Sequence, residues 1–370
     1  MTLSPQRGQT SILVLKSANS PSLAFKETPH KKRLPRSDTR AIMGSMKNQM
    51  NVSVWRDELA QLRTNKKEFL EQMERLIPWG EWKAIIEPHY YKGERGNKPY
   101  DLELMLRLFV VQNLYSLSDM ATRDEAIDSR AFSAFCGTDR TGQVPDGDTI
   151  GRFRRLLEKH GIQEKLFAQV RELLIEKGLI LKKGTIVDST FIEAPSSTKN
   201  REKKRDPEAH SGKKGSTWHF GYKSHIGVDK NSGLVHTTVT TAANVSDVSV
   251  TPKLLHREEE SVNGDSGYMG AEKREDAILR NKNGKKIKYK INRRPSQYKN
   301  NSARSRGQIK RREKEKSSVR SKVEHVFGVV KNLFGYRKTR YRGLAKQNAK
   351  LNVLFALANL YLAGKRGLAA

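Results

Sequence analysis

Apolar residues in the first half of the chain recur every three or four positions, which is the spacing of one buried face of an α-helix. One such run extends from Val54 to Ile77 and stops at Pro78, and another extends from Gln163 to Glu176. Between them, the segment after Pro99 is apolar on nearly all sides, as in a buried helix. We therefore predict an all-helical N-terminal domain over residues 51–180.

After Gly184 the pattern changes to short runs rich in β-branched residues, which are typical of strands. Strands are expected at TIVDST, at WHFGYKSHIGVD and LVHTTVTTA, and at SVNGD. Residues 230–233 predict a hairpin turn, and a helix is expected near residues 251–258. GKKIKYKIN alternates lysine with apolar residues, which predicts an edge strand with cations on one face. We therefore expect an α/β domain with a mixed sheet over residues 181–345.

The two ends of the chain differ from these domains. Residues 1–50 are rich in Ser, Pro, Thr and basic residues and lack a periodic pattern, so we expect a disordered basic extension. Residues 346–370 are expected to form a C-terminal helix and tail. The apolar run from Leu351 to Leu362 is interrupted by two asparagines and is shorter than the roughly 18 residues of a membrane span. It predicts a buried or amphipathic helix.

The charge balance indicates a polyanionic partner. The 370 residues include 71 lysines and arginines against 40 acids, which gives a formal net charge of +31. An excess of this size predicts attraction to nucleic acid, with an anionic membrane surface as the alternative. The single cysteine, Cys136, excludes an intrachain disulfide and a cysteine-based zinc knuckle, and it favours a reducing, cytoplasmic setting.

Two aspartates stand at the ends of predicted strands. Asp188 closes TIVD on the same strand face as Ile186, and Asp265 closes SVNGD between Gly264 and Gly267. Burying an unpaired carboxylate in a strand is costly, so we expect a chemical role for Asp188. A cap or turn role is the alternative for both, and for Asp265 taken alone it is the better one. Phosphodiester chemistry commonly uses two Mg²⁺ ions held by carboxylates, which makes both aspartates candidate metal ligands.

A third acid, Glu324, lies within a predicted helix from Ser317 to Lys338. At about 100° per residue, one apolar arc of this helix contains Val319, Val323, Val326, Phe327, Val330 and Phe334. Arg320, Glu324 and Lys331 fall within about 40° of one another along the edge of that arc. Glu324 is then either the partner of Arg320 in an ordinary i,i+4 ion pair or a metal ligand between two phosphate-binding cations. The helical geometry favours neither reading.

The three acids resemble the DDE triad of bacterial insertion-sequence transposases, and the similarity is closest to the insertion-sequence-5 family within the larger insertion-sequence-4 group. The motifs that carry the resemblance follow in order over about residues 55–362: VDSTFIEAPSSTKN, DPEAHSGKKGSTWHFGYKSHIGVD, TTAANVSD, GDSGYMGA and RSKVEHVFGVVK. The group has a Tyr-x2-Arg-x3-Glu-x6-Lys signature, which Arg320, Glu324 and Lys331 match. Ser317 stands at the tyrosine position, so a tyrosine-dependent contact is not carried over.

The resemblance implies an RNase H-like catalytic domain with a mixed β-sheet, next to a separate all-α domain for DNA-end binding and dimerisation. Asp188 would lie on the first, central strand, Asp265 after the fourth strand and Glu324 on the following helix. The implied enzyme is a metal-dependent DDE transposase. It would bind the terminal inverted repeats of an insertion sequence, cleave the ends and join the 3′-OH to target DNA.

The resemblance also implies the cofactors and partners. Asp188, Asp265 and Glu324 would be both the catalytic residues and the ligands of two Mg²⁺ ions, for which Mn²⁺ substitutes. The partners would be transposon-end and target DNA and a second copy of the chain in a synaptic complex. A bacterial, cytoplasmic and nucleoid-associated protein is expected, with no membrane and no small-molecule substrate.

DNA contacts are expected from cations and one aromatic residue around the acids. Residues 199–214 are expected to form a basic loop, and residues 282–316 a DNA-contacting strand and loop. Core packing is the default expectation for Trp218, which alternates with Phe220 and Tyr222 along a strand, although Trp218 near the site could stack on an exposed base. The resemblance implies that Arg320 and Lys331 neutralise phosphates beside the cut. The full set of expected DNA contacts is Arg320, Lys331, Lys199, Lys213, Lys214, Lys223, Trp218, Arg304 and Arg306.

Other polar residues have ordinary explanations. Glu193 falls on the strand face opposite Asp188, where an auxiliary role is a minor alternative. Ser246 and Asp247 are expected to cap a helix, and the resemblance leaves Asp247 a supporting role at the site. Three histidines lack the spacing of a metal motif and are expected in the interior or facing phosphate: His219, His225 and His236.

Two alternatives to a transposase remain at the level of sequence. One is an RNase H-fold DNA nuclease without strand transfer, and the other is a domesticated DNA-binding protein that has lost its chemistry. The large helical domain and the Arg-Glu-Lys set count against the nuclease, and the presence of all three acids counts against the non-enzyme.

Overall fold

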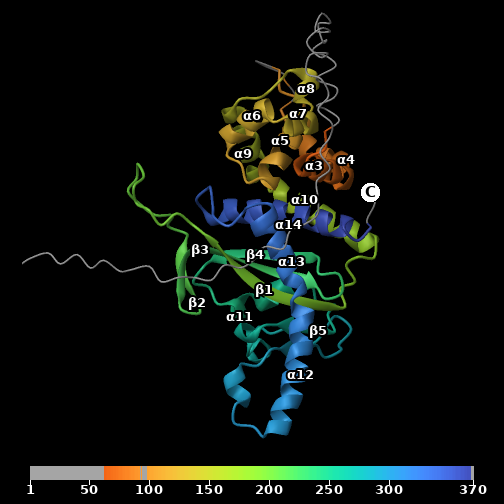
Figure 1. Cartoon of the computed structure of the whole chain (residues 1–370), viewed down its shortest axis with the longest axis vertical. Coiled ribbons are helices and arrows are strands. Elements are labelled where there is room, and N and C mark those ends of the chain that lie inside the picture. The colour runs from red at the N-terminus through yellow and green to blue at the C-terminus, as the bar shows by residue number, and fades with distance from the viewer. Residues whose placement is uncertain (1–61, 92, 94–97, 368–370) are drawn as a thin grey trace, which may run out of the picture. The chain divides into compact units, whose positions relative to one another are not determined.

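Helices occupy the first part of the computed structural model, which describes residues 62–91, 93 and 98–367 (Figure 1). Predictions for residues 1–50, and for the start of the first helix at Val54, lie outside these described residues. The regular elements described before residue 180 are α3 (Asn65–Leu76), α4 (Trp79–Ile86), η1 (Glu87–His89), α5 (Leu102–Leu114), α6 (Asp119–Asp128), α7 (Arg130–Cys136), α8 (Thr138–Thr141), α9 (Gly147–Lys159) and α10 (Ile162–Glu176).

Short polar side chains begin several of these helices. The side chain of Thr64 accepts a hydrogen bond from the backbone N–H of Lys67 at the start of α3, and Asp101 caps α5 in the same way. Such caps satisfy backbone donors that the first helical turn leaves without partners. The predicted helix from Gln163 to Glu176 is confirmed. α10 begins only one residue earlier, at Ile162, and ends at the same residue.

The second part of the chain contains a six-stranded mixed sheet. Its strands are β1 (Gly184–Glu193), β2 (His210–Lys214), β3 (Thr217–Asp229), β4 (Val235–Ala242), β5 (Ser261–Gly264) and β6 (Lys288–Ile291). β1 pairs antiparallel with β3 and parallel with β5, β5 pairs parallel with β6, and both β2 and β4 pair antiparallel with β3. The predicted mixed sheet, the hairpin turn at residues 230–233 and the edge position of β6 are confirmed.

Three local predictions are wrong. Residues 199–214 are not wholly loop, because their last five residues form β2 against an extension of β3. The helix expected near residues 251–258 is instead α11 (Asp247–Val250) followed by the 3-10 turn η2 (Thr251–Leu254), since Pro252 cannot continue an α-helix. The loop expected before residue 316 is largely the helix α12 (Ala303–Arg320), which is rich in the strong helix formers Arg, Lys and Glu.

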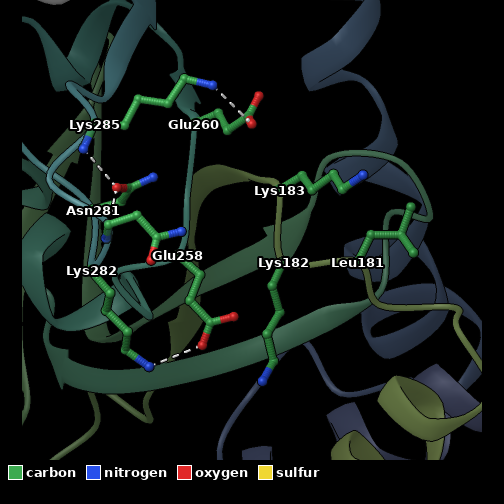
Figure 2. A pocket seen from close by; sticks show the side chains of 9 residues that line it. Leu181, Lys182, Lys183, Glu258, Glu260, Asn281, Lys282 and Lys285 are labelled. Atoms are coloured by element: carbon green, nitrogen blue, oxygen red, sulfur yellow. Dashed lines mark hydrogen bonds and ion pairs between the residues drawn. The ribbon is translucent and has the colours of Figure 1, made fainter.

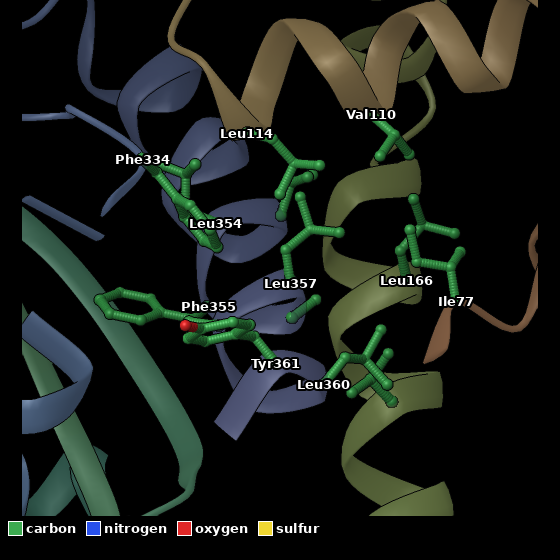
Figure 3. Packing of buried hydrophobic residues seen from close by; sticks show 14 of the residues in the cluster. Ile77, Val110, Leu114, Leu166, Phe334, Leu354, Phe355, Leu357, Leu360 and Tyr361 are labelled. Carbon is green, nitrogen blue, oxygen red and sulfur yellow. The ribbon is translucent and has the colours of Figure 1, made fainter. Parts of the chain in front are cut away.

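The helix α14 (Leu344–Gly364) lies between the helices and the sheet and contacts α10, α3 and α5 as well as β4 (Figure 1). Figure 3 shows Leu357 and Leu360 turned toward α10 and Phe355 turned toward the sheet. Because α14 is covered on both sides, it is buried along most of its length, as predicted for Leu351–Leu362. None of the described helices, α14 included, is long and apolar enough to cross a membrane.

The sheet separates two apolar cores, and the alternation of β1 assigns its side chains to them. Ile186 belongs to the large core that includes α13 (Lys322–Gly328), α14 and the N-terminal helices, whereas Val187 belongs to a smaller core with Tyr268. Asp188 shares the face of Ile186 because side chains alternate along a strand. The first predicted acid therefore points toward the layer that contains α13.

Candidate active site

Asp188 and Asp265 lie on two neighbouring parallel strands. The prediction that Asp188 ends its strand is wrong, because β1 continues to Glu193, and only Asp265 stands at a strand end. Gly184 pairs with Ser261 and Ile186 with Asn263, so the same register continued by two residues sets Asp188 opposite Asp265. Asp265 follows the last residue of β5 and caps the 3-10 turn η3 (Ser266–Tyr268), where it accepts a hydrogen bond of 2.9 Å from the N–H of Gly267. The structure thus brings together the two aspartates that the sequence singled out.

Burial disfavours the ionised form of the Asp188 carboxyl group. Its side chain is 15% exposed, and Oδ1 accepts a hydrogen bond of 2.8 Å from the N–H of Ser189. Burial, together with the charge of Asp265, raises the pKa of Asp188 to about 6, against the opposing effects of the Ser189 N–H and the charges of Arg320 and Lys214. A metal cation bound to both carboxylates would be favoured, because its charge would offset the burial of Asp188 and the repulsion from Asp265.

Arg320 links Glu324 to Asp188 by hydrogen bonds. The guanidinium of Arg320 donates one hydrogen bond of 3.1 Å to Oδ2 of Asp188 and another of 3.1 Å to Oε1 of Glu324. Glu324 is 62% exposed in the first turn of α13. The ordinary i,i+4 pair between Arg320 and Glu324 is present, but the same guanidinium also bonds the strand acid.

The helix that carries these residues is interrupted. α12 ends at Arg320, α13 begins at Lys322, and residues Val329–Leu333 form the π-helical turn η6. The prediction of one regular helix from Ser317 to Lys338 is therefore wrong, although its apolar arc is confirmed. Val323, Val326, Val330 and Phe334 are buried, and Val319 and Phe327 pack against them.

Lys331 lies in the π turn, where burial and the nearby charge of Lys214 lower the pKa of its amine. A helical wheel with a constant 100° per residue does not describe a π turn, which has more residues per turn. The relation of Lys331 to Glu324 therefore could not be read from sequence spacing.

Asp247 holds two side chains of β3 beside the site. Lys223 donates hydrogen bonds to Oδ1 of Asp247 at 3.0 Å and to the carbonyl of Val245 at 2.8 Å, and it is only 11% exposed. The ring of His225 lies 3.6 Å from the same carboxylate oxygen. Lys223 was predicted as a DNA contact, but its amine is bound inside the protein. Ser246 precedes α11 without making the expected side-chain cap bond.

Tyr268 lies beside these acids, although no sequence pattern assigned it to the site. It is 1% exposed, and its hydroxyl has no hydrogen-bond partner within the described residues. Burial and the charges of Asp247, Asp188 and Asp265 raise its pKa well above the ordinary tyrosine value. The available signal was its position three residues after Asp265, where a 3-10 turn brings the ring back under the strand ends.

The other predicted DNA contacts lie on exposed elements. On the β2–β3 hairpin, Lys213 stands opposite Trp218, whose side chain is 67% exposed and has the Lys213 amine 5.8 Å from its ring centroid. Trp218 is thus not a core residue. Arg304 and Arg306 lie on α12, which buries no residue. Lys199 is exposed in the segment before β2, and Lys214 ends that strand close enough to Asp188 to lower its pKa.

Glu193 and the three histidines have structural partners. Oε1 of Glu193 lies 3.2 Å from Nδ1 of His219, whose ring stacks on Phe191. His225 and His236 are buried, which confirms the interior placement expected for them. Nε2 of His225 lies 2.8 Å from the hydroxyl of Thr241, and burial lowers the pKa of both rings.

The chemistry of the acids suits a divalent cation, since carboxylate oxygens are the ligands that Mg²⁺ and Mn²⁺ prefer. Asp188 and Asp265 are neighbours, and a cation would offset the cost of ionising the buried Asp188. Across the described part of the chain, however, no three His, Cys, Asp or Glu side chains converge closely enough to hold an ion. Arg320 lies between Asp188 and Glu324. Asp188 and Asp265 can therefore contact a metal ion directly, whereas Glu324 is linked to them only through the Arg320 guanidinium.

Two family models match the chain. Residues 180–360 match the model described as "Transposase DDE domain", and residues 57–156 match the model described as "Transposase domain (DUF772)". No solved structure matches the chain. The first match covers the sheet with all three acids, and proteins with this domain generally use divalent metal ions to cleave DNA. The chain thus carries a DDE transposase domain over residues 180–360, preceded by a second transposase domain over residues 57–156.

Proposed function

We propose that the protein is an insertion-sequence transposase, of the insertion-sequence-5 type, that binds terminal inverted repeats, cleaves the ends and joins the 3′-OH to target DNA. The observation that carries this proposal is that Asp188 of β1 and Asp265 after β5 lie on adjacent parallel strands, with Glu324 joined to Asp188 by Arg320. The neighbour order β4–β3–β1–β5–β6, with β1 central, supports an RNase H-like catalytic domain over residues 181–345.

In this proposal Asp188, Asp265 and Glu324 hold the metal ions. Two divalent cations, Mg²⁺ or Mn²⁺, would supply Lewis-acid stabilisation of the attacking and leaving oxygens when bound. Asp188 and Asp265 contribute carboxylates fixed by the sheet, and burial of Asp188 favours a bound cation over a solvated one. Arg320 and Lys331 neutralise phosphates on either side of the scissile bond, which releases Arg320 from the acids.

The exposed cations then have a consistent role as contacts to the DNA strands. Lys213, Lys214 and Trp218 on the β2–β3 hairpin would contact one strand near the cut, with the indole stacked on an unpaired base. Arg304 and Arg306 on α12 and Lys199 before β2 would contact phosphates farther from it. The helices before residue 180 would bind the transposon end and form the homodimer that synapsis of two ends requires.

Incubation of the full chain with Mg²⁺ and a duplex that carries the terminal inverted repeat tests this function. Cleavage at the repeat followed by joining to a second DNA is the expected result. Cleavage without joining would show a nuclease, and binding without cleavage would show a DNA-binding protein that has lost its chemistry. Either outcome would overturn the proposal.

A further inference from the structure

A hollow of about 440 Å³ lies beside the residues that precede β1 (Figure 2). It is lined by four lysines, two glutamates, two asparagines and one leucine. Lys183 directly precedes β1, and Asp188 follows Gly184 by four residues, or about 13 Å at the rise of a strand. The hollow is therefore separate from the candidate active site.

The hollow has an excess of positive charge. Lys282 forms an ion pair of 3.0 Å with Glu258, and Lys285 forms one of 3.2 Å with Glu260, as Figure 2 shows. Lys182 and Lys183 stand at the other side of the hollow, and no carboxylate of the described residues lies within ion-pair distance of either amine. Two cations thus remain for an external anion.

The backbone around the hollow is held in an unfavourable conformation. Lys182 and Arg257 have φ angles of 55° and 66°, which are uncommon for residues with a side chain. The N–H of Lys282 donates a hydrogen bond of 2.7 Å to the carbonyl of Arg257, which ties the two rims together. Such strain costs on the order of 1–3 kcal/mol per residue and is typical of ligand-binding segments.

The edge strand β6 continues this positive surface toward the acids. Lys286, Lys288 and Lys290 are exposed, whereas Ile287, Tyr289 and Ile291 between them face the smaller core. None of these three lysines has a carboxylate partner among the described side chains. β6 runs parallel to β5 from Lys288 beside Ser261 to Ile291 beside Gly264, the residue before Asp265. The lysines therefore lead from the hollow to the catalytic end of the sheet.

We propose that the hollow and the β6 lysines bind the sugar–phosphate backbone of the duplex that extends from the catalytic acids. This site rests on the proposed function, because it needs DNA at the acids. Alternate residues of a strand stand about 6.6 Å apart, so these lysines form a row of evenly spaced cations, and the phosphates of a DNA strand form a row of evenly spaced anions. A regular row of unpaired cations matches this repeating charge, which an acidic peptide does not have.

Salt-dependent binding of a fluorescein-labelled terminal-repeat duplex tests the site. The hollow variant is Lys182→Gln with Lys183→Gln, and the strand variant is Lys288→Gln with Lys290→Gln. The control pair, Lys346→Gln with Lys365→Gln, removes the same charge from exposed positions at the start of α14 and at its C-terminal end. Because each phosphate contact contributes about 0.9 to the slope of log K against log salt, each test variant should flatten the slope by about 1.8.

The control pair should leave the slope near that of the unchanged protein. Hydroxyl-radical footprints should also show loss of protection on one side of the cleavage position in both test variants. Equal slopes for the test and control pairs, or an unchanged footprint, would overturn the site. Cleavage by the unchanged protein is scored separately. A protein that binds but does not cleave would contradict the proposed function and still test the site, and a protein that binds no DNA would overturn both.

Discussion

The guanidinium of Arg320 joins Asp188 to Glu324, two acids that are far apart in sequence and belong to a strand and a helix. Both hydrogen bonds are 3.1 Å long. The Arg320 side chain is 25% exposed, so DNA can reach the group that separates the acids. Arg320 therefore competes with any cation for the same two carboxylates, and DNA phosphate competes with the carboxylates for Arg320.

Removal of Arg320 should tighten metal binding in the absence of DNA. A unit charge about 4 Å from another contributes roughly 1 kcal/mol even in water, so Arg320→Gln should raise the affinity for Mn²⁺ about fivefold or more. Titration calorimetry of the DNA-free protein measures this change. Arg274→Gln is the matched control, because Arg274 pairs with the exposed Asp276. Equal Mn²⁺ affinity in the Arg320 variant and the control would contradict the competition.

Loss of Asp247 should destabilise the protein. Asp247→Ala leaves the Lys223 amine, which is 11% exposed, without a counter-charge, and breaking such a buried pair costs about 3–5 kcal/mol. Urea unfolding gives the free energy of unfolding, with Asp276→Ala as an exposed-acid control. Adding Lys223→Met to Asp247→Ala should recover part of the loss, since the unpaired charge is then gone. No recovery in the double variant would show that the cost has another origin.

Lys350 should make stability depend on pH. Burial lowers the pKa of its amine to about 7, and the charges of Arg340 and Arg154 act in the same direction. Between pH 7 and about 10 the unfolded chain binds this proton and the folded protein does not, so stability rises with pH there. Lys350→Met should therefore raise the free energy of unfolding by on the order of 2 kcal/mol at pH 7.

That advantage of the Lys350 variant should shrink as the pH rises toward 10. Urea unfolding of both proteins across this range measures the difference, in which the titration of other groups cancels. A difference that does not change with pH would show that the Lys350 amine is not held neutral in the folded protein.

Trp218 should contribute to DNA binding and not to folding. Its side chain is 67% exposed, so Trp218→Ala should leave the free energy of unfolding nearly unchanged. If its indole stacks on an unpaired base, the variant should bind a duplex with a frayed end more weakly by about 1–3 kcal/mol. Fluorescence anisotropy measures the loss, and a fully paired duplex, which offers no unpaired base for stacking, is the control. Equal affinities would exclude the stacking.

The sequence allowed the prediction of features that depend on local pattern. Asp188 and Asp265 were found because each ends a short apolar run, and the edge strand β6 was found because lysine alternates with apolar residues. The buried face around Val326 was likewise predicted from helical spacing. Such patterns show which side of an element is buried. The acids were predicted from their positions relative to these buried apolar runs.

Features that depend on distant partners could not be predicted. The bond from Arg320 to Asp188 joins residues that only the folded sheet brings together, and the partner of Lys223 lies 24 residues away. The π turn at Lys331 interrupts a pattern that continues without a break in sequence. Tyr268 showed no signal beyond its spacing from Asp265, since a buried tyrosine near charges looks like any core tyrosine.

End cleavage by variants of the three acids tests the central claim most directly. Asp188→Asn, Asp265→Asn and Glu324→Gln should each bind a terminal-repeat duplex and fail to cleave or join it with Mg²⁺. Asp276→Asn, which removes an exposed acid outside the site, should cleave like the unchanged protein. Cleavage and joining at the normal rate by the Asp188 or Asp265 variant would show that these two acids do not form the active site.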